Sequence, residues 1–144
     1  MSVVKAAEVS FTETTGAGTY TGSVSVPAGS TITDIIVNGV ALWTATTSAT
    51  LKVGDDGDDD GYYTGVDLKA TDLLAGESLS FSMAGGKAGA YIANSQVSPR
   101  YSASARTISG IVTTVGAAGS AGRTRMTVLY TTTGSGVVSA ATKA

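Results

Sequence analysis

The sequence predicts an all-β fold: a single-domain β-sandwich, jelly-roll-like, built from seven to nine short strands. Thr, Ser and Val alternate in short segments separated by glycine-rich turns, a pattern typical of strands that bury one face. No segment repeats apolar residues at helical spacing over several turns. The 144 residues also suit one domain with a single modest core.

The N-terminal part predicts three strands in succession. The first covers residues 3–11 and the second 19–26. Alternation along the second strand places four residues on one face: Tyr20, Gly22, Val24 and Val26. A Pro-Ala-Gly turn leads into a third strand over residues 31–42, whose Ile-Ile-Val run is apolar enough to be covered on both faces. Asn38-Gly39 within it is alternatively a hairpin turn.

The middle of the chain predicts shorter elements. Strands are expected over residues 50–53, 62–68, 78–83 and 90–92. One helical turn is expected within residues 67–76, with Thr71 as its N-cap and Gly76 as its end. In the strand 78–83, three apolar side chains point inward: Leu79, Phe81 and Met83.

The C-terminal part predicts two longer strands, 107–115 and 123–131. In the last strand, one face carries Met126, Val128 and Tyr130. The sandwich domain is therefore expected to span residues 1–131. Residues 132–144 are expected to form a C-terminal tail that is flexible or docks on a partner.

The chain contains no cysteine and no histidine. This excludes disulfides, thiolate nucleophiles, Cys/His zinc sites and Ser-His-Asp triads. A glycosidase would have to use carboxylates alone, and the spacing of the candidates favours no pair among Asp34, Asp67, Asp72 and Glu77. We therefore expect a protein that is not an enzyme.

The N-terminus lacks the basic segment and continuous apolar stretch of a secretory signal. No apolar run approaches the roughly 20 residues needed to span a bilayer. We therefore expect synthesis in the cytoplasm and no membrane partner.

Charge is unevenly distributed along the chain. All eleven acidic residues lie at or before Glu77, so the first 78 residues sum to −8 and the last 66 to +6. One interpretation is a basic part that faces an acidic surface or a neighbouring copy. The other is that strands from both halves interleave, so that the asymmetry disappears in space. The basic residues are scattered and lack accompanying aromatic residues, so nucleic-acid binding is not expected.

An acidic loop at residues 55–60 carries five aspartates in six positions. The order D-x-D-x-D-G, with a closing carboxylate at position twelve, wraps calcium in other proteins. The predicted calcium ligands are Asp56, Asp58, Asp60 and Asp67. The closing residue is Asp instead of Glu and strands flank the loop, so this is not an EF-hand. The alternative is a solvated hairpin tip whose charges maintain solubility. No cofactor is otherwise required.

Four segments resemble small virion proteins of tailed bacteriophages. They are the Pro-Ala-Gly turn at 27–29, TSATLKVGD at 47–55, the tyrosine pair at 62–63 and AGRTRMTVLY at 121–130. Together they define a stretch of similarity that covers about half of the chain. Such proteins are capsid decoration (cement) proteins, head fibres or tail accessory proteins, and they are β-rich and often trimeric. The resemblance implies a virion structural protein that binds the major capsid protein as a homotrimer and stabilises the outer capsid surface.

A second function stays open on the same resemblance. The chain is alternatively a tail or head-fibre tip that binds a host-surface glycan, with calcium in the acidic loop. Trp43, Tyr62 and Tyr63 are the aromatic residues available to such a site. For Trp43 and one of the tyrosines, packing in the core is the competing expectation.

Overall fold

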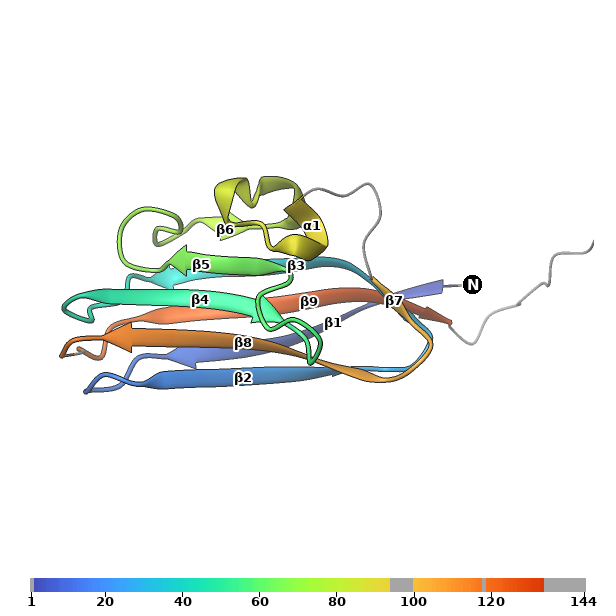
Figure 1. Cartoon of the computed structure of the whole chain (residues 1–144), viewed down its shortest axis with the longest axis horizontal. Coiled ribbons are helices and arrows are strands. Elements are labelled where there is room, and N and C mark those ends of the chain that lie inside the picture. The colour runs from blue at the N-terminus through green and yellow to red at the C-terminus, as the bar shows by residue number, and fades with distance from the viewer. Residues whose placement is uncertain (1, 94–99, 118, 134–144) are drawn as a thin grey trace, which may run out of the picture.

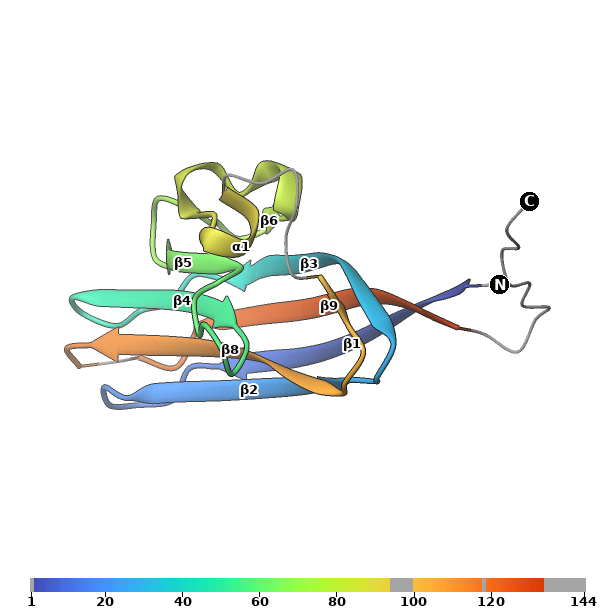
Figure 2. The same ribbon diagram turned by 45° about the vertical axis from the view of Figure 1, so that its right-hand side comes forward.

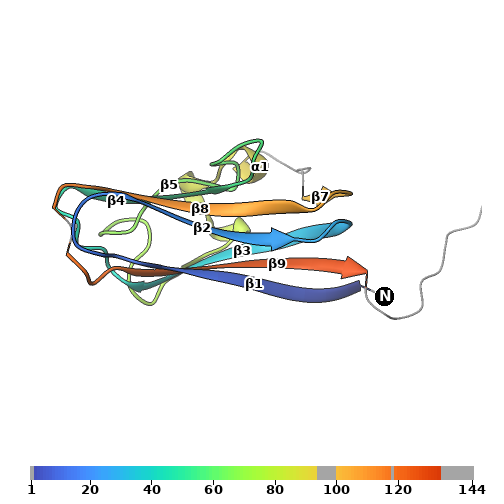
Figure 3. The same ribbon diagram turned by 90° about the horizontal axis from the view of Figure 1, so that it is seen from below.

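The computed structural model describes residues 2–93, 100–117 and 119–133. Nine strands form two antiparallel sheets that pack face to face (Figure 1; Figure 3). The strands are β1 (Ser2–Thr12), β2 (Thr19–Val26), β3 (Ser30–Ala41), β4 (Ser48–Gly54), β5 (Tyr63–Asp67), β6 (Ser78–Leu79), β7 (Tyr101–Ser102), β8 (Arg106–Val115) and β9 (Arg123–Thr133). The first sheet has the order β1-β9-β3-β6, with β7 also paired to β3, and the second has the order β2-β8-β4-β5. The predicted all-β, jelly-roll-like sandwich is confirmed.

Strands from the two halves of the chain interleave in both sheets. β9 lies between β1 and β3, and β8 lies between β2 and β4. Arg125 on β9 consequently lies near an acidic residue of the first half, with its Nε 4.0 Å from Glu8 Oε2. The strands of the two halves therefore interleave, as the second interpretation expected, although the aspartates of the acidic loop stay together.

The core fills the space between the inward faces of the sheets. The predicted inward faces of the second and last strands are confirmed, since Val26, Met126 and Val128 are fully buried. β3 runs straight through Asn38-Gly39, so that pair is not a hairpin turn. Trp43 also belongs to the core, and its Nε1 donates a hydrogen bond to Thr124 Oγ1 at 2.8 Å.

Residues 68–93, called here the capping segment, cover one side of the sandwich (Figure 2). The segment contains β6 and three short helices: η1 (Phe81–Met83), η2 (Gly85–Lys87) and α1 (Ala90–Ala93). β6 pairs with Val37 and Asn38 of β3, and Ala88 forms a bridge with Tyr63 of β5. The edges of both sheets are therefore covered on this side.

Three predictions for this segment are wrong. Residues 67–76 contain turns and no helix. The Asp67 carboxylate accepts the Lys69 amide at 2.7 Å and the Thr71 hydroxyl at 2.8 Å, and these bonds close a turn in place of the helix. The strand predicted over 78–83 ends at Leu79, and Met83 is 70% exposed. There the Phe81 amide donates to the side chain of Asp34 on β3, at 3.0 Å from Oδ1, instead of continuing the backbone pairing with β3. The strand predicted over 90–92 is the helix α1.

The last strand continues to Thr133, two residues beyond its predicted end, and pairs there with Ser2. The rest of the predicted tail, residues 134–144, lies outside the described residues. Over the described ranges, no helix is long and apolar enough to cross a membrane.

Candidate functional site

The acidic loop connects β4 to β5 and is organised by its first aspartate. Asp55 Oδ1 accepts the backbone amides of Gly57 at 3.0 Å and Asp58 at 3.1 Å. The same oxygen accepts the Tyr91 hydroxyl of α1 at 3.0 Å. One carboxylate oxygen therefore closes the turn and ties it to the capping segment.

Close packing fixes the loop further. A Cβ on Gly61 would lie 2.4 Å from the Tyr91 ring, and one on Gly89 would lie 2.1 Å from the Asp60 carbonyl oxygen. Only glycine allows these approaches. The Tyr91 ring also meets Tyr62 edge-on at 5.1 Å. The backbone of the loop is thus held against the capping segment, while Asp56 and Asp59 stay exposed, so a solvated tip remains an alternative to a calcium site.

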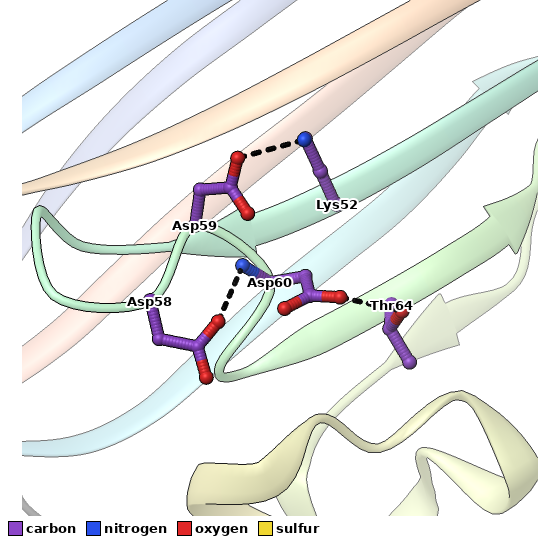
Figure 4. Close-up of polar contacts among 5 residues, drawn as sticks. All are labelled: Lys52, Asp58, Asp59, Asp60 and Thr64. Atoms are coloured by element: carbon purple, nitrogen blue, oxygen red, sulfur yellow. Dashed lines mark hydrogen bonds and ion pairs between the residues drawn. The ribbon is translucent and has the colours of Figure 1, made fainter.

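Three carboxylates gather at the outer turn of the loop (Figure 4). One oxygen from each of Asp58, Asp59 and Asp60 lies within 4.8 Å of the others. Lys52 Nζ on β4 is 2.7 Å from Asp59 Oδ2, and Thr64 Oγ1 donates to Asp60 Oδ2 at 3.0 Å. The cluster therefore concentrates several negative charges beside a single lysine.

The carboxylates of the cluster influence one another's protonation. The side-chain hydrogen bond between Asp58 and Asp60 raises the pKa of Asp58 and lowers the pKa of Asp60. The hydrogen bond with Asp59 raises the pKa of Lys52. The neighbouring carboxylates also repel one another because they carry like charges. A hard cation, which prefers carboxylate oxygens as ligands, relieves this repulsion.

The structure brings together only part of the predicted calcium ligand set. Asp58 and Asp60 lie in the cluster, whereas Asp56 is exposed and lies outside it. Asp67 lies at the far end of β5, opposite Thr50, where its Oδ1 accepts the Lys69 amide at 2.7 Å. Asp59 replaces these two in the cluster. The twelve-residue spacing does not bring Asp67 to the cluster, because β5 extends away from the loop. Calcium binding itself stays a prediction.

The three aromatic residues considered for glycan binding belong to the core. Trp43 is 2% exposed, and Tyr62 and Tyr63 are fully buried. The Tyr63 hydroxyl donates to the Ile35 carbonyl oxygen at 2.5 Å, and burial raises the pKa of Tyr63. These side chains therefore form no exposed platform for a sugar ring.

A buried carboxylate at one end of the sandwich was not anticipated. Glu13 is 1% exposed, and its Oε1 accepts the Thr44 amide at 2.9 Å, the Thr44 hydroxyl at 2.8 Å and the Gly122 amide at 3.0 Å. Burial alone would raise the pKa of Glu13, but the hydrogen bonds from Thr44 and Gly122 outweigh it and lower the pKa. Glu13 therefore joins three separate loops. Nothing in the sequence around this single glutamate predicted that it would be buried and would bind two other loops.

The four carboxylates considered for a glycosidase all bind backbone amides. Asp34 Oδ1 accepts the Ile35 amide at 2.8 Å, and Glu77 Oε1 accepts the Leu74 amide at 2.7 Å. A groove of about 380 Å³ beside β5 is lined by both Asp67 and Asp72. Asp72 Oδ2 accepts the Asp67 amide at 2.7 Å and lies 3.4 Å from Lys87 Nζ. The structure therefore brings two of the four candidates to one groove.

Comparison with known proteins gives two structural matches. No family model matches the chain, and no curated protein matches it. A chain of the cyanophage Pam1 capsid asymmetric unit has a TM-score of 0.55 and 17% identity, over 92% of this chain and 85% of that chain. A chain of the acidic stable capsid structure of Helicobacter pylori bacteriophage KHP30 has a TM-score of 0.57 and 18% identity, over 91% of each chain. The shared fold agrees with the resemblance to phage virion proteins found in the sequence.

Proposed function

We propose that this chain is a structural protein of a tailed-phage virion that binds the outer capsid surface as a homotrimer and stabilises the shell. The observation that supports this most is the fold shared with chains of two phage capsid structures over 91–92% of its length. The proposed partner is the major capsid protein, and the proposed role is not enzymatic.

The lengths of the matched chains support decoration over shell building. The match covers 85% of one matched chain and 91% of the other, so each has nearly the length of this chain. The likeness therefore extends over small whole chains and is not confined to one domain of a much larger subunit.

The outer faces of the sandwich suit contact with a broad protein surface. Hydroxyl side chains predominate on the outer face of β2 and β8, where Ile111 and Val115 are also present. They are Thr19, Thr21, Ser23, Ser25, Thr107, Ser109 and Thr113. On the other sheet, Val4 and Val40 are 69% and 55% exposed. Flat faces that mix hydroxyl and apolar groups bind other proteins through direct and water-mediated contacts.

The test is to add the purified protein to capsids that lack it. We expect saturable co-sedimentation and a higher capsid melting temperature, because a ligand that binds only the assembled state stabilises it. An unrelated β-sandwich of similar size and charge is the control for nonspecific adsorption. A protein that stays in the supernatant at micromolar concentration would refute the proposal.

A further inference from the structure

One side of the sandwich is left uncovered in both sheets. β1 and β2 lie along the side opposite the capping segment (Figure 1). β1 pairs with β9 in an unbroken register from Ser2 to Thr12, and β2 pairs with β8 in an unbroken register from Thr19 to Val26. Within the described ranges, no strand pairs with the outer edge of either. Neither edge contains proline or a bulge, two of the features that protect free edges, and β2 also carries no charge.

The open edges present backbone groups in a defined pattern. The Glu13 amide donates to the Gly122 carbonyl, so odd-numbered residues of β1 bond to β9 and the amides of Ala6 and Ser10 point outward. The Thr114 amide likewise donates to the Gly18 carbonyl, so even-numbered residues of β2 bond to β8. The amides of Thr21 and Ser25 therefore also point to the open side. Such groups are unpaired unless water or another strand binds them.

The two open edges lie close together and run in opposite directions. A Cβ on Gly22 of β2 would lie 2.6 Å from Val9 Cγ2 and 3.1 Å from the Phe11 ring of β1. The sandwich therefore narrows to a wedge on this side. β2 runs away from the loop end at which β1 arrives (Figure 3).

We propose that this wedge is the interface between three copies of the chain, in which β1 of each copy pairs antiparallel with β2 of the next. The three-fold axis runs parallel to the strands. This inference rests on the homotrimer of the proposed function and names the surface that forms it. Because β1 and β2 run in opposite directions within one copy, each β1 meets the neighbouring β2 antiparallel. The ring closes and leaves neither edge free for further chains.

Charge is compatible with this pairing. β2 carries no charged residue, whereas β1 carries Lys5 and Glu8. No like charges are therefore placed opposite each other when β1 of one copy meets β2 of the next. Pairing of β1 with β1 across a two-fold axis is the competing arrangement.

A three-fold rotation about an axis parallel to the strands preserves height, which limits the register. Within one copy, Val9 Cγ2 lies nearest the Cβ position of Gly22, at 2.6 Å, with the Phe11 ring next at 3.1 Å. The register set by the nearer contact places Ala6 level with Ser25 of the neighbouring copy. Within one copy, Ala6 and Ser25 are exposed on the outer faces of different sheets. Across the interface they would lie on one continuous face.

The first test is disulfide cross-linking of the double variant Ala6→Cys/Ser25→Cys. The chain has no cysteine of its own, and Cα atoms of paired antiparallel residues are about 4.5–5.5 Å apart, within disulfide range. We expect a covalent trimer on a non-reducing gel and only monomer from each single variant. A covalent dimer from Ala6→Cys alone would establish the two-fold arrangement and overturn the proposal, as would the absence of cross-linked species.

The second test removes one outward amide. Thr21→Pro lacks the donor on the open edge of β2, whereas the matched variant Thr21→Ala keeps it. We expect light scattering to give the 14.2 kDa monomer for the proline variant and three times that mass for the alanine variant. A proline variant that stays trimeric at the same concentrations would refute the interface. If that variant does not fold by circular dichroism, the cross-linking result decides.

Capsid binding is measured on the same preparations. A trimer that does not bind capsids would support the interface and refute the proposed function. A monomer that binds and stabilises capsids would refute the interface and the homotrimer, and would leave capsid decoration supported.

Discussion

The two sides of the sandwich differ in whether the edges of their sheets are covered. On the covered side, the capping segment lies over β3 and β5 and buries the rings of Tyr62 and Tyr63. On the open side, β1 and β2 show unbroken strand edges that carry Ser, Thr and Ala. The covered side is therefore expected to determine the stability of the single chain. The open side is expected to determine association.

The largest expected effect is from Tyr63→Ala on the covered side. The side chain is fully buried and its hydroxyl bonds to β3, so the free energy of unfolding should fall by about 3–5 kcal/mol. Thr21→Ala on the open side should change it by less than about 0.5 kcal/mol. Urea unfolding measured by tryptophan fluorescence compares the two. Equal losses in the free energy of unfolding would show that the two sides contribute equally to the stability of the single chain.

Gly61→Ala sharpens the comparison within the capping contact. The added methyl group would lie 2.4 Å from the Tyr91 ring, so we expect a loss of about 1–3 kcal/mol and displacement of α1. Gly86→Ala is the matched control, because no atom lies within 4 Å of its Cβ position. Hydrogen exchange of residues 85–93 reports the displacement. Unchanged protection in Gly61→Ala would mean that Tyr91 does not hold the loop.

Glu13→Gln tests the end of the sandwich where the two sides are joined. Glu13 follows β1 of the open side and binds Thr44, which follows β3 of the covered side. Loss of hydrogen bonds to a charged group should cost about 2 kcal/mol near pH 7. Because the pKa of Glu13 is lowered in the folded protein, its contribution is present above the ordinary pKa and is lost as pH falls through the folded pKa.

The stability difference between wild type and Glu13→Gln should therefore shrink as pH falls below about 4. Guanidinium unfolding across that range measures it. A difference independent of pH would show that the hydrogen-bonded carboxylate is not ionised in the fold.

The smallest expected effect is calcium binding by the acidic loop. Titration calorimetry should give a dissociation constant on the order of 10⁻⁴–10⁻³ M, typical of weak sites. Asp59→Asn should weaken binding more than Asp67→Asn, because Asp59 lies in the carboxylate cluster and Asp67 does not. A larger loss of calcium affinity in Asp67→Asn than in Asp59→Asn would instead support the ligand set with the twelve-residue spacing. No heat at millimolar calcium would leave the loop with a purely structural role.

The long strands were predictable because apolar and polar residues alternate along a strand that buries one face. β2 has the predicted bounds and β8 differs by one residue, since Val24 and Ile108 alternate with hydroxyl side chains. The capping segment was not predictable, because tertiary contacts override its local pattern. Phe81 leaves the sheet where its amide meets Asp34, a residue 47 positions earlier.

The candidate site was predictable in part. Five neighbouring aspartates marked the loop, but spacing alone did not show that β5 carries Asp67 away from it. Nor did it show that Asp55 binds Tyr91, 36 residues further on. Contacts of this kind depend on how the capping segment packs, which periodicity does not encode.

The position of the last strand has a consequence for synthesis. β9 is the centre of its sheet, between β1 and β3, and most of the contacts that hold those strands depend on it. β1 and β3 cannot pair with β9 until residues 123–133 have left the ribosome. The nascent chain therefore holds β1 without its partner β9 while residues 13–122 are being made. Folding is expected to be late, slow and dominated by contacts between distant parts of the chain.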